Sequence, residues 1–366
     1  MSNTPLMSNS PFMTPDQSRQ RRSRAARRRR RRQAMMGTTL VVALIAGIAA
    51  VLLAGGSSAA HRGPARHAPA AGKAPARALL SAGGLPLAKP ALTLSGLGAP
   101  SADAIRLSFH HPPRAGLLFD LDSGRVLWQR NPSRRLRIAS LTKMMTALLT
   151  VRSAAPSTRV LVTRQAVASG GSKVGVLPLG RRVRLETMLY GLMLPSGNDA
   201  AIALAQQLAG SVRAFVARMN AEAARLGMGC TLYSSPSGYY DAGNFSCAAD
   251  LAVLAHVDLA EPRIARIVHT YSAALPFPIK GGKLYLYNNN PLLIYHYPGT
   301  TGLKTGFTDA AGRCLVASAE RGGVRLGVVL LDSPDPGTQA RKLLDRGFHD
   351  VYRLPKVPEP PMPADA

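Results

Sequence analysis

Residues 138–149 read IASLTKMMTALL and place a serine and a lysine three positions apart at the head of an otherwise apolar run. The run favours a helix, and positions i and i+3 of a helix share a face, so Lys143 can reach the Ser140 hydroxyl. A serine hydroxyl is a weak nucleophile until a neighbouring base takes its proton, and a lysine of lowered pKa can be that base. Taken alone, the pair also fits a serine that caps a helix beside a solvated lysine. Other motifs in the chain are needed to distinguish a catalytic pair from a helix cap.

The positive charge of the chain is concentrated near its N-terminus. The sequence has 366 residues and a formal net charge of +27, and ten arginines lie between Arg19 and Arg32. Such a tract alone is typical of nucleic-acid binding. Here an uncharged segment from Met35 to Ala60 follows directly, and Leu40 to Ala54 is almost continuously apolar. A segment of this length and character is just sufficient to cross a bilayer as a helix.

We therefore predict a basic cytoplasmic tail over residues 1–34 and a transmembrane anchor over residues 35–56, oriented by the arginines on its N-terminal side. A cleaved signal peptide is the alternative, because Ser58-Ala59-Ala60 offers small residues at a cleavage site. Either way the remainder is exported. We expect a single-pass protein of the inner membrane with its catalytic domain in the periplasm, and no nucleic-acid partner.

The composition predicts three segments after the anchor. Residues 57–102 are rich in Ala, Pro and Gly and are expected to form a linker, residues 103–354 a folded domain, and residues 355–366 a disordered tail. Within the domain we expect strands first, helices in the middle, and strands with a closing helix last. The expected strands are 115–120, 125–130, 159–162, 284–287, 301–307, 313–319 and 325–331, and the expected helices are 140–155, 185–194, 200–208, 212–226, 248–257 and 338–351. This order predicts an α+β fold in which early and late strands share one antiparallel sheet.

The cysteines, histidines and tyrosines give no indication of a metal or cofactor. Cys230 and Cys247 can pair in an oxidising compartment, which leaves Cys314 as a small buried residue on a strand. The cysteine spacing matches no zinc pattern and no histidines show metal-ligand spacing, so no metal and no cofactor are expected. The tyrosines between Tyr285 and Tyr297 are expected to pack against the rest of the domain rather than to form a platform for a ligand.

Two more polar motifs follow the first in the chain: Ser196-Gly197-Asn198 and Lys304-Thr305-Gly306. Each alone is an ordinary loop or strand entrance. Together with Ser140-x-x-Lys143 they resemble, in order and spacing, the three signatures of the penicillin-recognising serine DD-peptidases. Over about Arg114 to Leu354 the chain is similar to the low-molecular-mass D-alanyl-D-alanine carboxypeptidases and the related DD-endopeptidases.

The resemblance implies a β-lactamase/transpeptidase-like fold, with an antiparallel sheet flanked by helices and an all-α region. It also implies a catalytic set of Ser140, Lys143 and Ser196. In such an enzyme Ser140 attacks the carbonyl of the penultimate D-alanine and becomes acylated, and Lys143 is the base for this step. The Ser196 hydroxyl then relays the proton to the leaving amine.

The resemblance further implies a set of substrate-binding residues. Asn198 holds the substrate backbone or Lys143, while Lys304 and Thr305 receive the C-terminal carboxylate of the peptide. Gly306 lets its strand approach the substrate closely. The backbone N–H of Phe307, with that of Ser140, forms the oxyanion hole.

The expected partners are peptidoglycan stem peptides, with β-lactam antibiotics as covalent inhibitors. The sequence leaves open whether the enzyme removes a terminal D-alanine or cleaves D-alanyl cross-links, because residues 307–316 look closer to the endopeptidases and Ser196-Gly197-Asn198-Asp199 to the carboxypeptidases. The part after the Lys-Thr-Gly motif is too short for the extra C-terminal β-domain of some carboxypeptidases, so membrane attachment is expected at the N-terminus. A β-lactamase, which usually needs a dedicated glutamate, and a non-catalytic wall-binding protein are the remaining alternatives.

Overall fold

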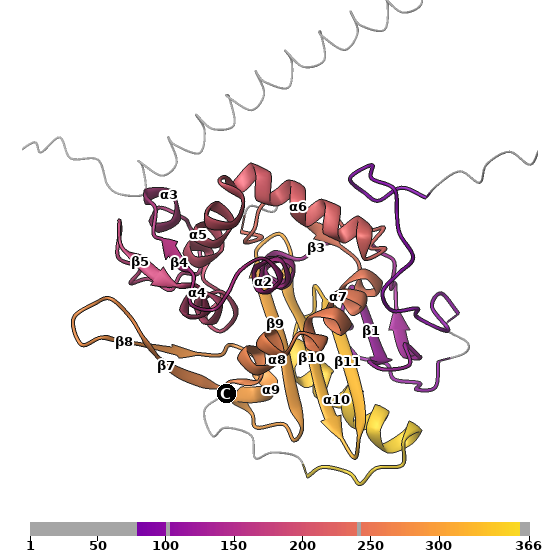
Figure 1. Ribbon diagram of the computed structural model, residues 1–366. Coiled ribbons are helices and arrows are strands. Elements are labelled where there is room, and N and C mark those ends of the chain that lie inside the picture. The colour runs from indigo at the N-terminus through magenta and orange to yellow at the C-terminus, as the bar shows by residue number, and fades with distance from the viewer. Residues whose placement is uncertain (1–78, 100–102, 240–242, 359–366) are drawn as a thin grey trace, which may run out of the picture. The chain divides into compact units, whose positions relative to one another are not determined.

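The computed structural model describes residues 79–99, 103–239 and 243–358 (Figure 1). Contacts divide the chain into two units, Met1–Ala74 and Pro75–Ala366, and all described residues belong to the second. The predicted basic tail, the predicted anchor, the first part of the predicted linker and most of the predicted C-terminal tail lie outside the described residues. Within those ranges no single helix is long and apolar enough to cross a bilayer, although the bent pair Asn198–Ala209 and Val212–Arg225 passes that test jointly.

A five-stranded antiparallel sheet forms the base of the domain, in the order β2-β1-β11-β10-β9. The strands are β1 (Ala115–Asp120), β2 (Val126–Arg130), β9 (Thr300–Thr308), β10 (Gly312–Arg321) and β11 (Val324–Leu331). The pairing of β1 with β11 confirms that early and late strands share one sheet. Because β9 is an edge strand of this sheet, one of its two edges is not paired with another strand of the sheet. That edge is available to the elements that form the site.

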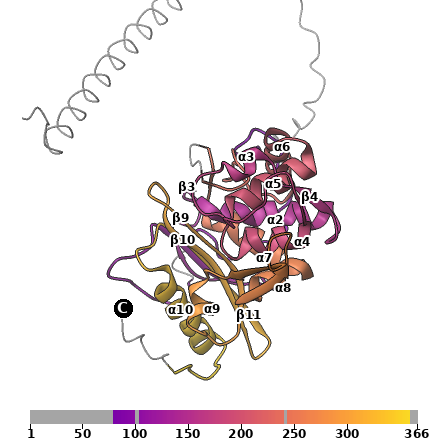
Figure 2. The same cartoon turned by 90° about the vertical axis from the view of Figure 1, so that its left-hand side faces the viewer.

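The sheet is buried on both faces, which explains why β1 is a continuous apolar run rather than an alternating one. Leu118 on β1 packs in one apolar cluster with Leu343 of α10 (Pro336–Arg346). Leu117, its neighbour, packs in the other cluster with Leu254 of α7 (Ala248–Ala260). Figure 2 shows α10 on one side of the sheet and the helical region on the other.

The helical region is organised around α2 (Thr142–Ser153), which carries the serine and lysine motif at its start. Its first seven residues, 142–148, are all buried, so this helix is enclosed rather than amphipathic. The helices around it are α3 (Arg164–Val167), α4 (Leu185–Met193), α5 (Asn198–Ala209), α6 (Val212–Arg225) and α8 (Pro262–His269). Short elements complete the domain: η2 (Ala139–Leu141), α9 (Pro291–Ile294), the π-helical turn η3 (Gly347–Val351), and the strand pairs β3–β6 (Leu136–Arg137, Phe245–Ser246), β4–β5 (Arg159–Leu161, Arg182–Arg184) and β7–β8 (Ser272–Pro276, Lys283–Tyr287).

Most expected elements are present, and the differences lie at element ends and in short elements. The closing helix expected over 338–351 begins at Pro336, capped by the Asp335 carboxylate, and its last turn is π-helical. The sequence analysis missed α8, although Pro262 stands at its first turn, where a proline suits a helix start. It also missed β5 and β7, whose few residues carry little pattern of their own.

The predicted linker over 57–102 is too long, because residues 79–99 pack against the domain. Leu92 is buried, and the Val126 N–H donates to the Ser95 carbonyl at 3.0 Å. The Ala82 N–H likewise donates to the Gly229 carbonyl at 3.1 Å. Backbone hydrogen bonds and a few apolar side chains hold this segment, so its Ala- and Pro-rich composition was a poor guide to its structure.

The expectation that the tyrosines near residue 290 pack against the rest of the domain is correct for one and wrong for three. Tyr297 is buried and its hydroxyl donates to Asp345 at 2.8 Å. Tyr285, Tyr287 and Tyr295 are instead 64%, 62% and 49% exposed. Cys314 is buried on β10, as expected.

Candidate active site

Ser140 stands at the entrance to α2, on the 3-10 turn η2. The preceding residue, Ala139, adopts a φ of 46°, a left-handed conformation that costs energy in a residue with a Cβ and recurs at functional sites. Lys143, one turn later, is fully buried, and its Nζ lies 2.8 Å from the Ser140 Oγ. The structure thus brings the predicted nucleophile and base into direct contact.

Two carbonyl oxygens, besides the Ser140 hydroxyl, contact the Lys143 amine. The Nζ donates to the Asn198 Oδ1 at 2.7 Å and to the Ser237 carbonyl at 2.8 Å. A neutral amine has two N–H donors and one lone pair, so these two bonds direct the lone pair toward the Ser140 hydroxyl. That arrangement suits proton transfer from Ser140 to Lys143.

The electrostatics favour the neutral form of this lysine. Burial holds the pKa of Lys143 well below its ordinary value, the charge of Lys304 lowers it further, and Asp199 raises it. Desolvation disfavours an ammonium because the low-dielectric interior cannot replace its hydration. Burial also lowers the pKa of Lys304, to about 7. Burial therefore makes it easier for Lys143 to act as a base than for an exposed lysine.

The second motif lies across from the first, between α4 and α5. Ser196 has a φ of 67°, and its buried Oγ has no hydrogen-bond partner among the described residues. A buried hydroxyl without a partner is rare, and here it faces a cavity. Asn198 is the first residue of α5, and its Nδ2 donates to the Gly170 carbonyl at 2.7 Å. Its side chain therefore joins Lys143 to the loop that precedes α4.

The third motif lies on β9, at the edge of the sheet. Thr305 and the 62% exposed Phe307 line the cavity. Lys304 is buried behind them, and its Nζ donates to the Thr305 carbonyl at 3.0 Å. A Cβ on Gly306 would lie 2.9 Å from the Ile138 carbonyl oxygen and 3.2 Å from the Ser140 nitrogen. Gly306 also lines the cavity, and it permits β9 to approach the Ser140 turn closely.

All three motifs meet at one cavity of about 460 Å³. Ser140, Ser196, Thr305, Gly306 and Phe307 were predicted from the sequence and line it. The other lining residues were not predicted. They come from the loop between α3 and β5, from around α9, from β10 and from the start of α10: Ser172, Asn289, Pro291, Tyr295, Arg313, Cys314, Asp335, Pro336 and Gly337. Lys143 and Lys304 are buried and do not line this cavity. Asn198 lines a second cavity of about 550 Å³, which shares Ser140, Ser172 and Phe307 with the first.

A sequence profile described as D-alanyl-D-alanine carboxypeptidase, peptidase family S11, matches residues 107–335. The chain belongs to this family. It is 35% identical to D-alanyl-D-alanine carboxypeptidase DacF of Bacillus subtilis over 256 residues, which cover 66% of this chain and 65% of DacF. It is 33% identical to a D-alanyl-D-alanine endopeptidase of Pseudomonas aeruginosa, over 63% of this chain and 78% of that protein. The match thus spans slightly less than two thirds of DacF.

The fold of this S11 peptidase is also that of a solved relative. The crystal structure of a D-alanyl-D-alanine carboxypeptidase from Mycobacterium tuberculosis superposes with a TM-score of 0.63 at 34% identity, covering 68% of this chain and 95% of that one. The family predicted from three short motifs is confirmed, as is the α+β penicillin-binding fold. The roles of the individual site residues stay predictions.

Two of the residues that the sequence analysis missed bear directly on the chemistry. Ser237 contributes only its backbone carbonyl, so no residue type marks it in the sequence. Arg313, on β10 opposite Phe307, brings an exposed guanidinium to the cavity and donates from Nη1 to the Pro334 carbonyl at 2.7 Å. Arg313 could have been predicted from the sequence, because it follows the Lys-Thr-Gly strand after a short turn and so lies beside that strand.

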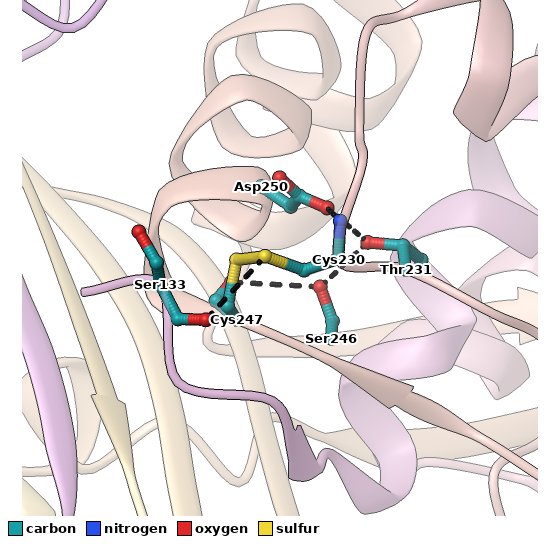
Figure 3. The surroundings of a disulfide bond; sticks show 6 residues. All are labelled: Ser133, Cys230, Thr231, Ser246, Cys247 and Asp250. Carbon is teal, nitrogen blue, oxygen red and sulfur yellow. Dashed lines mark hydrogen bonds between the residues drawn. A yellow bond between two sulfur atoms is a disulfide. The ribbon is translucent and has the colours of Figure 1, made fainter. Parts of the chain in front are cut away.

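A disulfide closes the loop that supplies Ser237 to the site. Cys230 and Cys247 are bonded, as the sequence analysis allowed, and the Asp250 carboxylate beside them accepts from the Cys230 N–H at 2.8 Å (Figure 3). Within this loop Gly238 lies so close to the Ala139 carbonyl that a Cβ could not fit. The disulfide therefore restrains a segment that packs against the nucleophile turn.

Replacing both bonded cysteines by serine should lower the free energy of unfolding by about 3 kcal/mol, the stabilisation expected for a loop of this length. Urea unfolding of the Cys230→Ser/Cys247→Ser variant and of the wild type measures it. Addition of a thiol reductant should destabilise the wild type by a similar amount and leave the variant unchanged. Equal stability of the two proteins without reductant would show that the loop is held by its hydrogen bonds alone.

Proposed function

We propose that this S11 peptidase removes the terminal D-alanine from peptidoglycan stem peptides through an acyl-enzyme on Ser140, with water as the final acceptor. The observation that carries the proposal is the contact of the Lys143 amine with the Ser140 hydroxyl, held by Asn198 and Ser237. A base whose pKa is lowered by burial and that is already hydrogen-bonded to the nucleophile makes a serine reactive without a histidine.

The first step forms the acyl-enzyme. The Ser140 Oγ attacks the carbonyl carbon of the penultimate D-alanine while the Lys143 Nζ takes the hydroxyl proton. The tetrahedral intermediate collapses and the peptide C–N bond breaks. Lys143 then gives up the proton, which passes through the Ser196 hydroxyl to the departing amine of D-alanine; this hydroxyl has no hydrogen-bond partner among the described residues. The stem peptide remains as an ester on Ser140.

The second step releases the shortened peptide. Water attacks the ester carbonyl, its proton passes to Lys143, and the Ser140 hydroxyl is restored. In this proposal the backbone N–H groups of Ser140 and Phe307 stabilise the oxyanion in both steps, a contribution that is typically a few kcal/mol. A β-lactam acylates Ser140 in the same way, but the opened ring stays attached to the acyl group.

The terminal carboxylate of the peptide docks beside β9 in this proposal. Thr305 and Arg313 face the cavity there, and Lys304 lies behind Thr305. A carboxylate near Lys304 would raise the pKa of this lysine from about 7 and so favour its charged form. The binding of the anion and the protonation of Lys304 therefore support each other.

Cleavage of D-alanyl cross-links is the second candidate, since a named endopeptidase is among the relatives. The β-lactamase alternative loses support because no glutamate among the described residues lines the cavity, and Glu186 and Glu222, which lie on helices, are paired elsewhere. Glu186 pairs with Arg263 and Arg266, and Glu222 pairs with Arg152 and Arg225. A carboxylate paired with arginines on a helix surface is a poor general base.

Attachment to the inner membrane through residues 35–56, with the catalytic domain in the periplasm, remains part of the proposal. Its support is the uncharged segment from Met35 to Ala60 behind ten arginines. An N-terminal anchor would hold the site near newly made wall material.

The test is to incubate the purified full chain with a stem pentapeptide that ends in D-alanyl-D-alanine and, separately, with cross-linked muropeptides. Mass spectrometry should show tetrapeptide and free D-alanine from the first substrate at a rate that penicillin abolishes. Cleavage of the cross-linked substrate alone would establish the endopeptidase, and absence of D-alanine release from the pentapeptide would refute the leading proposal.

A further inference from the structure

A row of exposed side chains runs along β8 toward the active site. Lys283, Tyr285, Tyr287 and Asn289 are exposed, and every residue between them is buried. This alternation places Lys283, Tyr285 and Tyr287 on one face of β8, because successive side chains of a strand point to opposite faces. Asn289 follows two residues beyond the end of the strand. Two tyrosine rings, each more than 60% exposed, therefore lie side by side along one line.

The surface around these rings is open. In the β7–β8 hairpin Tyr285 stands opposite Ala274 and Tyr287 opposite Ser272, so the cross-strand neighbours are too small to cover the rings. Figure 1 shows this hairpin extending away from the five-stranded sheet. Exposed aromatic side chains gathered on one face usually mark a binding surface.

The row continues into the catalytic cavity. Asn289 lines the cavity, and its N–H donates to the Leu194 carbonyl at 3.3 Å, which ties it to the turn before Ser196. Tyr295, also half exposed, lines the same cavity. At about 3.3 Å per residue the row extends roughly 20 Å outward from Asn289. A ligand bound along this row would therefore adjoin a substrate bound in the cavity.

We propose that Tyr285 and Tyr287 bind the glycan strand that carries the stem peptide. The inference rests on the proposed function for its substrate. A sugar ring offers an apolar C–H face and a rim of hydroxyls, and a tyrosine offers a flat apolar ring with a polar tip. Alternate residues of a strand are about 6.6 Å apart, so two sugars of a chain can each stack on one ring.

The experiment compares the full-length wild type with the Tyr285→Ala/Tyr287→Ala variant and, as the matched control, the Tyr285→Phe/Tyr287→Phe variant, which keeps both rings. The first measurement is co-sedimentation with insoluble glycan strands from which an amidase has removed the stem peptides. The alanine pair should bind about tenfold more weakly than the wild type, and the phenylalanine pair should bind nearly as well as the wild type.

The second measurement separates binding from catalysis. The alanine pair should show about a tenfold higher KM for glycan-linked pentapeptide with kcat unchanged, while its turnover of the free pentapeptide equals that of the wild type. Unchanged sedimentation of the alanine pair, or an equal loss of activity on free and glycan-linked peptide, would overturn the proposal. Failure of the wild type to act on free pentapeptide would refute the proposed function instead, and the sedimentation result would still decide on the glycan surface.

Discussion

Substituting Ser140 by alanine should abolish covalent labelling of the protein by a fluorescent penicillin and should reduce D-alanine release by about 10⁴-fold or more. The hydroxyl that Lys143 contacts at 2.8 Å would be lost, and with it the atom that forms the ester. The fold should survive, because Ser140 lies at the cavity surface and the change removes one atom. Gel fluorescence after labelling, together with an assay of free D-alanine, measures the effect.

Ser153→Ala is the matched control for this substitution. Ser153 is an exposed residue at the other end of the same helix, so its replacement should leave labelling unchanged. Mass spectrometry of the labelled wild type should place the adduct on the peptide that contains Ser140. An adduct on Ser196, another serine that lines the cavity, or full labelling of Ser140→Ala would show that the nucleophile is misassigned. An unchanged cellular role for Ser140→Ala would favour the non-catalytic wall-binding protein.

The parts of the fold that could be predicted are those in which one side-chain pattern extends over a whole element. The apolar run of β1 and the glycine turn between β10 and β11 carry their own signal, and the structure has them as predicted. The segment around Leu92 could not be recognised, because backbone hydrogen bonds to distant residues hold it. The tyrosines of β8 were misjudged because the alternation that exposes Tyr285 equally fits rings that point inward.

The residues of the candidate site likewise include some that could be predicted from the sequence and some that could not. Ser140, Ser196 and Thr305 could be found because their residue types and spacing are characteristic, and the structure gathers them around one cavity. The Ser237 carbonyl could not be found, because every residue has a carbonyl and only the fold selects this one. The close contact of Gly306 with the Ser140 turn also depends on two elements that are far apart in the sequence.

Substituting Lys143 by methionine, which has a similar length but no amine, should lower the rate of acylation by penicillin by about 10³-fold. Lys173→Met is the matched control, because Lys173 is an exposed lysine whose Nζ donates only to the Val167 carbonyl among the described residues. Stopped-flow measurement of acylation gives both rates. A Lys143→Met variant that acylates as fast as the Lys173→Met control would exclude Lys143 as the base.

The pH dependence of acylation tests the same assignment in the unmodified enzyme. Burial lowers the pKa of Lys143, so the neutral amine is the prevailing form at pH values where an exposed lysine is still charged. As the pH falls through the lowered pKa, the amine gains a proton and loses the lone pair that accepts the Ser140 proton. The acylation rate should therefore be constant above this pKa and fall tenfold per pH unit below it. The Lys143→Met variant should lack this limb, because its residual rate does not depend on an amine. If the same limb persisted in the variant, the titrating group would be another one, and Lys304, with a pKa of about 7, would be the next to substitute.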